Sequence, residues 1–103
     1  MSGVSNPYRF QYETVAGGQT AQVLGGTGAK GDYLHRLIIS IVTAATSGVT
    51  IIDGVTSIVL LTGAATNVPG VYSLEVDMVS ASGAWSVTTG AGATVVAVGI
   101  FSA

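Results

Sequence analysis

Glycine-containing turns divide the sequence into short runs rich in Val, Ile and Thr, and the spacing of these turns limits the fold more than any single motif does. β-Branched residues are stiff at χ1 and fit a pleated strand, whereas each Gly inside a helix costs about 1 kcal/mol. With 15 glycines spread along the chain, no helix is expected. About eight short strands, with turn signals roughly every eight to twelve residues, are typical of an antiparallel sandwich or jelly roll.

We therefore predict an all-β fold, an antiparallel β-sandwich of jelly-roll type. Turn signals set hairpins but not long crossovers, so an immunoglobulin-like strand order stays open beside the jelly roll. The dipeptide Asp53-Gly54, between two β-branched runs, predicts a hairpin. Strands are expected over residues 8–14, 19–24, 32–43, 49–53, 55–62, 71–80, 85–89 and 94–101.

Two of these strands have informative faces. Residues 71–80 alternate large apolar side chains with polar ones that include Glu75 and Asp77, so one face is predicted to pack on the core. In 32–43 both faces become apolar beyond Arg36, which predicts burial on two sides.

The length fits one domain, with residues 1–7 as a flexible N-terminal segment and residues 8–103 as a single β-sandwich domain. The formal net charge is −2, and the only cations are Arg9, Lys30 and Arg36. These cannot neutralise a run of phosphates, so nucleic acid is not an expected partner.

Neither a membrane nor an oxidising compartment is indicated. The longest apolar run, 37–45, is about half as long as a membrane helix must be, and no signal peptide precedes it. The chain has no cysteine, which rules out a disulfide framework and fits assembly in a reducing cytosol.

Catalysis is not expected, because only 8% of the residues are charged and His35 is the sole histidine. One imidazole cannot build a metal site, and no Gly-x-Ser-x-Gly elbow supplies a nucleophile. The loop 25–31 is rich in Gly, but it lacks the Gly-Lys-Ser/Thr and the helix of a phosphate-binding loop. We predict no enzyme activity, no cofactor and no metal, a flexible loop at 25–31, and a half-buried His35 that is hydrogen-bonded to a neighbour.

Glu75 and Asp77 lie two residues apart on one strand face, where like charges repel. Three interpretations remain open. The face is solvated, the acids pair with Arg36 or Lys30 of the same or another subunit, or they bind calcium with Asp53 as a third ligand.

Aromatic residues suggest two different surfaces. Tyr8, Phe10 and Tyr12 share one face of an N-terminal strand, a natural arm for docking on a neighbouring subunit or a larger surface. Aromatics elsewhere are candidates for a sugar-stacking platform, although aromatics in sandwiches are more often core or interface anchors. The platform candidates are Trp85, Tyr33, Tyr72 and Tyr8. The interface candidates are Tyr8, Arg9, Phe10, Tyr12, Lys30 and Arg36.

The chain resembles small structural proteins encoded with the head genes of tailed bacteriophages, and it is most similar to capsid decoration (cement) proteins. The similarity runs over residues 30–103. It rests on the segments Gly31–Ile39, Val49–Gly54, Tyr72–Met78 and Gly83–Gly90.

The resemblance implies a small sandwich or jelly roll, frequently a homotrimer, that binds the outside of the expanded shell at threefold or quasi-threefold positions and clamps adjacent capsomers. Its partners would be further copies of itself and the major capsid protein, and its place the exterior of a virion assembled in the bacterial host cytoplasm. No catalytic residue is carried over. The alternative is a receptor- or glycan-binding module displayed on the virion, which predicts an exposed Trp85 or Tyr33 lining a groove.

Overall fold

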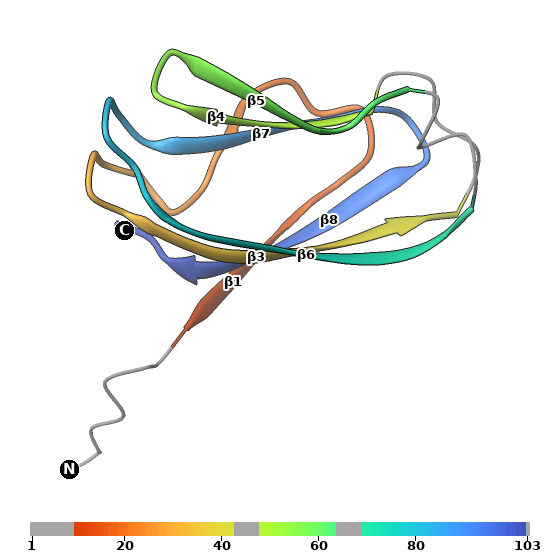
Figure 1. Cartoon of the computed structure of the whole chain (residues 1–103), viewed down its shortest axis with the longest axis horizontal. Coiled ribbons are helices and arrows are strands. Elements are labelled where there is room, and N and C mark those ends of the chain that lie inside the picture. The colour runs from red at the N-terminus through yellow and green to blue at the C-terminus, as the bar shows by residue number, and fades with distance from the viewer. Residues whose placement is uncertain (1–9, 43–47, 64–68, 103) are drawn as a thin grey trace, which may run out of the picture.

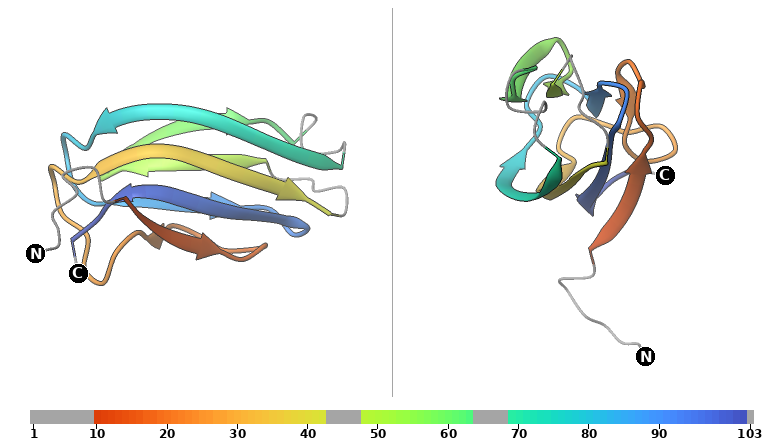
Figure 2. Two further views of the ribbon diagram at one scale, coloured as in Figure 1. Left: turned by 90° about the horizontal axis from the view of Figure 1, so that it is seen from below. Right: turned by 90° about the vertical axis from the view of Figure 1, so that its right-hand side faces the viewer.

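The computed structural model describes residues 10–42, 48–63 and 69–102, and within these residues every regular element is a strand. Two four-stranded antiparallel sheets are stacked face to face (Figures 1 and 2). In spatial order, the first sheet contains β1 (Gln11–Val15), β8 (Ala93–Ile100), β3 (Tyr33–Ile41) and β6 (Gly70–Val79). The second contains β2 (Gln22–Val23), β7 (Trp85–Thr89), β4 (Val49–Asp53) and β5 (Thr56–Leu61). The prediction of an all-β fold with about eight strands is confirmed.

Local signals placed most strands well, and the hairpin at Gly54 is present, with Asp53 opposite Thr56. The strand expected over 19–24 is the exception, because only two of its residues pair with β7. Ala21 adopts a left-handed φ of 49°, and its amide donates to the Thr88 hydroxyl instead of joining a regular ladder. This local turn of the backbone shortens the strand.

The core lies between the two sheets and is filled from β3 and β8 on one side and β4 and β7 on the other. On β3, Leu34, Leu37 and Ile39 point inward and are fully buried. The predicted burial of both β3 faces is wrong. Ile38 and Ser40 remain partly exposed, because within the described residues no further layer covers the outer face of this sheet.

Trp85 is the largest buried side chain, with only 1% of its surface exposed. Its indole Nε1 donates to the Asp32 carbonyl at 3.0 Å, so the polar end of the ring is satisfied inside the core. The Asp32 carboxylate in turn accepts bonds from the Ala29 amide and from the amide and hydroxyl of Ser102. The indole, the 25–31 loop and the C-terminal end of the chain are thereby tied together.

The expectation of a flexible loop at 25–31 is not met. The amides of Thr27 and Gly28 donate to the Ser102 carbonyl, and the Gly31 amide donates to the carbonyl and hydroxyl of Ser80. These bonds join the loop to residues far away in the sequence and give it a defined path.

One long side of the sandwich, between the edge strands β1 and β2, is closed by the chain itself. Glu13 of β1 accepts two hydrogen bonds of 2.8 Å, one from the Gln22 side chain and one from the Gly25 amide. Farther along, the Thr89 hydroxyl donates to the Ala16 carbonyl. We call this the sealed side.

Candidate functional site

The outer face of the β1-β8-β3-β6 sheet brings together residues that the sequence singled out separately. Tyr12 lies opposite Val98, Val98 lies opposite Arg36, and Arg36 lies opposite Glu75. Because directly opposed residues of a sheet share a face, these four form one row across all four strands, which we call the outer-face row. Tyr12 is 73% exposed and dominates one end of the row.

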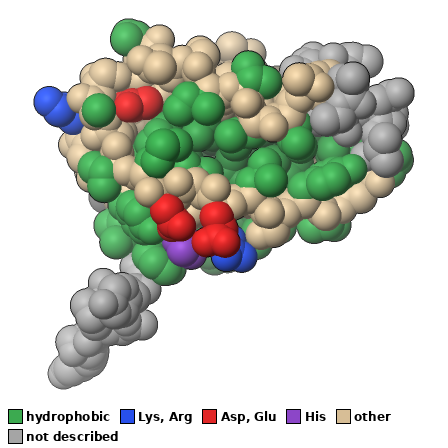
Figure 3. Space-filling model, in the orientation of Figure 1, with side chains coloured by type: hydrophobic (Ala, Val, Ile, Leu, Met, Phe, Trp, Pro, Cys, Tyr) green, Lys and Arg blue, Asp and Glu red, His purple; other side chains and the backbone are tan. Residues whose placement is uncertain are grey.

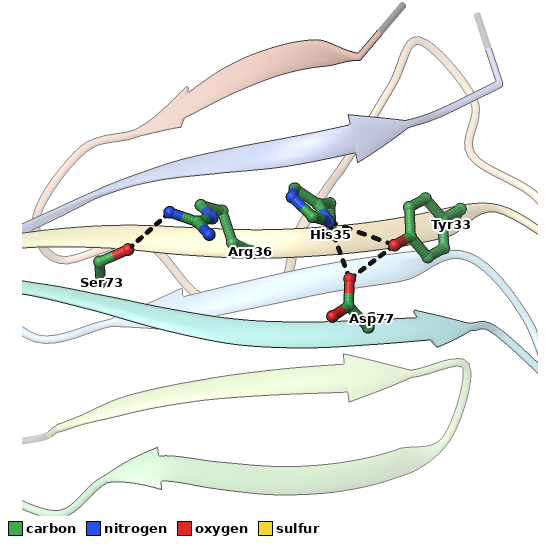
Figure 4. Close-up of polar contacts among 5 residues, drawn as sticks. All are labelled: Tyr33, His35, Arg36, Ser73 and Asp77. Atoms are coloured by element: carbon green, nitrogen blue, oxygen red, sulfur yellow. Dashed lines mark hydrogen bonds and ion pairs between the residues drawn. The ribbon is translucent and has the colours of Figure 1, made fainter. Parts of the chain in front are cut away.

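Next to this row, the ladder between β3 and β6 is irregular. Leu34 pairs with Met78 and Arg36 pairs with Glu75, so a single residue of β3, His35, faces two residues of β6. One of those two, Asp77, has a left-handed φ of 50°, a conformation that Asp tolerates better than most residues. This bulge turns the Asp77 carboxylate toward β3 (Figure 4).

The bulge gathers a compact aromatic and polar cluster, which comprises Phe10, Tyr33, His35 and Asp77. Tyr33 donates its hydroxyl to Asp77 Oδ1 at 2.6 Å, and His35 Nδ1 lies 2.8 Å from the same oxygen (Figure 4). The Phe10 ring stacks on the His35 imidazole, with 4.5 Å between ring centroids and 14° between planes. The half-buried, hydrogen-bonded His35 expected from the sequence is confirmed.

Hydrogen bonding sets the charge of this cluster. The bond from the Tyr33 hydroxyl, followed by that from His35, lowers the pKa of Asp77 below its ordinary value. The same bond to Asp77 raises the pKa of Tyr33, because the neutral phenol is the donor. Near neutral pH the cluster therefore holds a carboxylate, and its Tyr33 remains a hydrogen-bond donor.

Arg36 has donor capacity to spare. Its Nη1 donates to the Ser73 hydroxyl at 3.3 Å, and its Nε is buried without a hydrogen-bond partner among the described residues (Figure 4). Although Arg36 faces Glu75 across the ladder, the ion pair found in the described part of the chain joins His35 to Asp77. The expected pairing of the acids with Arg36 inside one subunit is thus not observed. Because Nε is buried, an acceptor supplied from outside could bond only the Nη groups of this guanidinium.

The structure brings Phe10, Tyr12 and Arg36 onto one face, but it leaves Lys30 apart, in the 25–31 loop. Tyr8 and Arg9 lie outside the described residues. Sequence reasoning missed the cluster as a unit. The spacing of Tyr33 and His35 was a usable signal, since alternate strand residues share a face, but nothing in the sequence announces the bulge.

Two other expectations fail on geometry. The sugar platform does not assemble, because Trp85 is buried in the core and Tyr72 packs against the core, which leaves Tyr33 as the one described member that is partly exposed on the outer face. The calcium site is not formed either, because Asp53 accepts bonds from the amides of Ala81 and Ser82. These backbone bonds lower the pKa of Asp53 and hold the β4–β5 hairpin to the β6–β7 turn. Residues 10–42, 48–63 and 69–102 contain no group of three or more potential metal ligands.

A pocket of about 410 Å³ lies beside the sealed side and is lined in part by Gln11, Glu13 and Gly25. Two of its polar side chains already hold the fold together, since the Gln11 side-chain carbonyl oxygen accepts a bond from the Phe101 amide and Glu13 accepts one from the Gly25 amide. In the described ranges, no helix is long and apolar enough to cross a bilayer. The outer face, with its row and cluster, is therefore the candidate site. No family model, no curated protein and no solved structure matches this chain.

Proposed function

We propose that the protein is a non-enzymatic virion structural protein that binds the outer surface of an assembled phage capsid as a homotrimer and clamps neighbouring capsomers. The observation that carries this proposal is the outer face of the first sheet. It is a broad surface with exposed Tyr12, half-exposed Val96 and Val98, and an incompletely bonded Arg36, and it also carries Glu75 and Asp77. Aromatic and Arg side chains in an apolar setting are the residues that protein interfaces favour.

We also propose that the strand order is that of a jelly roll. Four antiparallel pairs are nested, β1 with β8, β2 with β7, β3 with β6 and β4 with β5. This nesting is what results when one long hairpin is rolled into two sheets, and two further pairs, β3 with β8 and β4 with β7, join the rolled strands. Jelly rolls are common in viral capsid components, which agrees with the resemblance to decoration proteins.

The cluster of Phe10, Tyr33, His35 and Asp77 supports this role by fixing where the N-terminal strand begins. Phe10 stacks on His35, two residues before the exposed Tyr12, so the start of the N-terminal strand is tied to β3. Rigid presentation lowers the entropic cost of binding a lattice.

The proposed mechanism is thermodynamic linkage. A protein that binds the assembled shell but not free capsomers stabilises the shell by RT ln(1 + [L]/Kd) per site. Three linked binding faces add avidity when their spacing matches that of the lattice. No chemical step is required of any side chain.

The test is co-sedimentation with empty expanded capsids of the phage that encodes the chain, followed by thermal rupture of the loaded shells. We expect the protein to pellet with the shells and to raise their rupture temperature. Tyr12→Ser should weaken pelleting, whereas Val23→Ser, on the exposed face of the other sheet, should not. Shells that rupture at the same temperature with and without bound protein would show that the cementing role is wrong.

A further inference from the structure

Among residues 10–42, 48–63 and 69–102, no segment covers the long side opposite the sealed side. Its edge strands are β5, which pairs with β4, and β6, which pairs with β3. Inward-facing side chains of these two strands are only partly buried against the core, and they line the space between the sheets. They are Ile58, Leu60, Leu61, Tyr72, Leu74 and Val76. Figure 3, which looks onto this side, shows hydrophobic side chains filling a hollow between two paler rims. We call this strip the open seam.

The edges of the seam add further apolar surface. Val59 on β5 is 61% exposed and Val71 on β6 is 71% exposed. An edge strand also presents backbone N–H and C=O groups that can pair with another strand. This side therefore offers two features that drive association, an apolar strip and the backbone groups of two edge strands.

Most of this side is free of charge, although the second half of β6 carries Glu75 and Asp77 on its rim. No Asp, Glu, Lys, Arg or His occurs between Asp53 and Glu75, a stretch that includes all of β5 and half of β6. Side chains that lie close to a symmetry axis approach their own copies, and like charges brought together there are costly. A strip that faces a threefold axis therefore favours side chains without charge, whereas a surface for a different partner can use complementary charges.

Timing points the same way. An apolar seam between strand edges invites indiscriminate pairing unless it is covered soon after folding. Another copy of the same chain is present wherever the protein is made, but an assembled lattice is not. Arg36 and Glu75 lie on the outer-face row, and Asp77 lies in the cluster beside it, so these charges remain available for a different surface.

We propose that the open seam is covered by other copies of this chain, so that the seams of the three protomers face one another around the trimer axis. This inference rests on the proposed trimeric assembly role and names the surface that builds it. The outer-face row is then left for the shell, so self-association and shell binding use separate faces of the molecule.

The experiment compares two lysine substitutions on the full chain by sedimentation velocity across a range of protein concentrations. Val71→Lys places a charge on the edge strand β6 beside the seam, where the side chain points to the outer face and is already exposed, so the core is not expected to be disturbed. Val55→Lys places the same charge at the tip of the β4–β5 hairpin, where Val55 is 90% exposed, and is the matched control. Leu74→Asp, inside the seam, is a stronger variant, and circular dichroism establishes whether it folds.

We expect a trimer for the wild-type protein and for Val55→Lys, and at least a tenfold weaker association for Val71→Lys. A wild-type monomer at all concentrations, or a Val71→Lys trimer as tight as the control, would overturn the inference. Shell co-sedimentation separates this result from the proposed function. If the protein is monomeric but still pellets with shells, the seam inference is wrong and the shell-binding role stands. If the protein forms a trimer through the seam but does not pellet with shells, the seam inference stands and the shell-binding role is wrong.

Discussion

The two long sides of the sandwich differ in how the core between the sheets is shielded from water. On the sealed side, Glu13 reaches across from β1 to Gln22 and Gly25, and the chain closes over its own edge strands. On the open side, β5 and β6 leave six large apolar residues partly uncovered. The same chain closes one side with its own residues and leaves the other side apolar and uncovered. We explain this difference by a partner surface that covers the open side.

The largest effect should come from two leucines that face each other across the ladder. Leu37 on β3 is fully buried, whereas its neighbour Leu74 on the edge strand β6 lines the seam. Leu37→Ala should lower the free energy of unfolding by about 2–5 kcal/mol. Leu74→Ala should cost less, about 1–2 kcal/mol, in dilute protein, because part of its surface already meets water. Urea unfolding at two protein concentrations measures both.

If copies cover the seam, the cost of Leu74→Ala should grow as the protein concentration rises, whereas that of Leu37→Ala should not. If the costs of the two substitutions depend equally on protein concentration, the seam is not completed by other copies of the chain.

The second effect tests how tightly the sealed side is built. Gly25 has a φ of 89°, and a Cβ added there would lie 2.3 Å from the Ser102 carbonyl oxygen. Gly25→Ala should therefore destabilise the fold by about 2–4 kcal/mol, from the left-handed backbone and the backbone clash together. Gly18 is the control, because its φ is 79° but nothing lies within 4 Å of an added Cβ, so Gly18→Ala should cost only about 1–2 kcal/mol.

A smaller effect is expected from the polar closure itself. Glu13→Gln keeps one carbonyl oxygen but loses the charge that strengthens both bonds, and it should cost about 1–2 kcal/mol in urea unfolding. Gln22→Ala, which removes only one of the two donors, should cost less. If neither variant changes the unfolding midpoint, Glu13 does not close this side.

The smallest effect concerns pH. The pKa of Asp77 is lowered in the folded state by the bonds from Tyr33 and His35, and the backbone bonds to Asp53 lower its pKa likewise. Each carboxylate thus adds stability that is present above the ordinary carboxyl pKa near 3.8 and is lost as the pH falls below it. Thermal unfolding between pH 7 and pH 2 should show this loss. Asp77→Asn, which tolerates the left-handed backbone, should lose less stability over the same range.

The sequence predicted the elements better than it predicted the site. Period-two alternation and the Asp53-Gly54 turn gave the strands, because these signals are local. The shortened strand near Gln22 and the ordered 25–31 loop were missed, since both depend on bonds to distant residues such as Thr88 and Ser102.

The site shows the same limit. Phe10, Tyr12 and Arg36 could be named from residue type, but their common face depends on β8 lying between β1 and β3. The cluster around Asp77 depends on a bulge that no Gly or Pro marks in the sequence. Long-range pairing and a single unusual backbone angle therefore decided what local patterns could not.

Hydrogen exchange of the backbone amides gives the most direct test, because it reports on both sides of the sandwich in one sample. The account predicts that raising the protein concentration slows exchange in β5 and β6, while exchange in the edge strand β1 stays unchanged. Equal exchange in β5 and β6 at low and high concentration would contradict the claim that copies of this chain complete its open side.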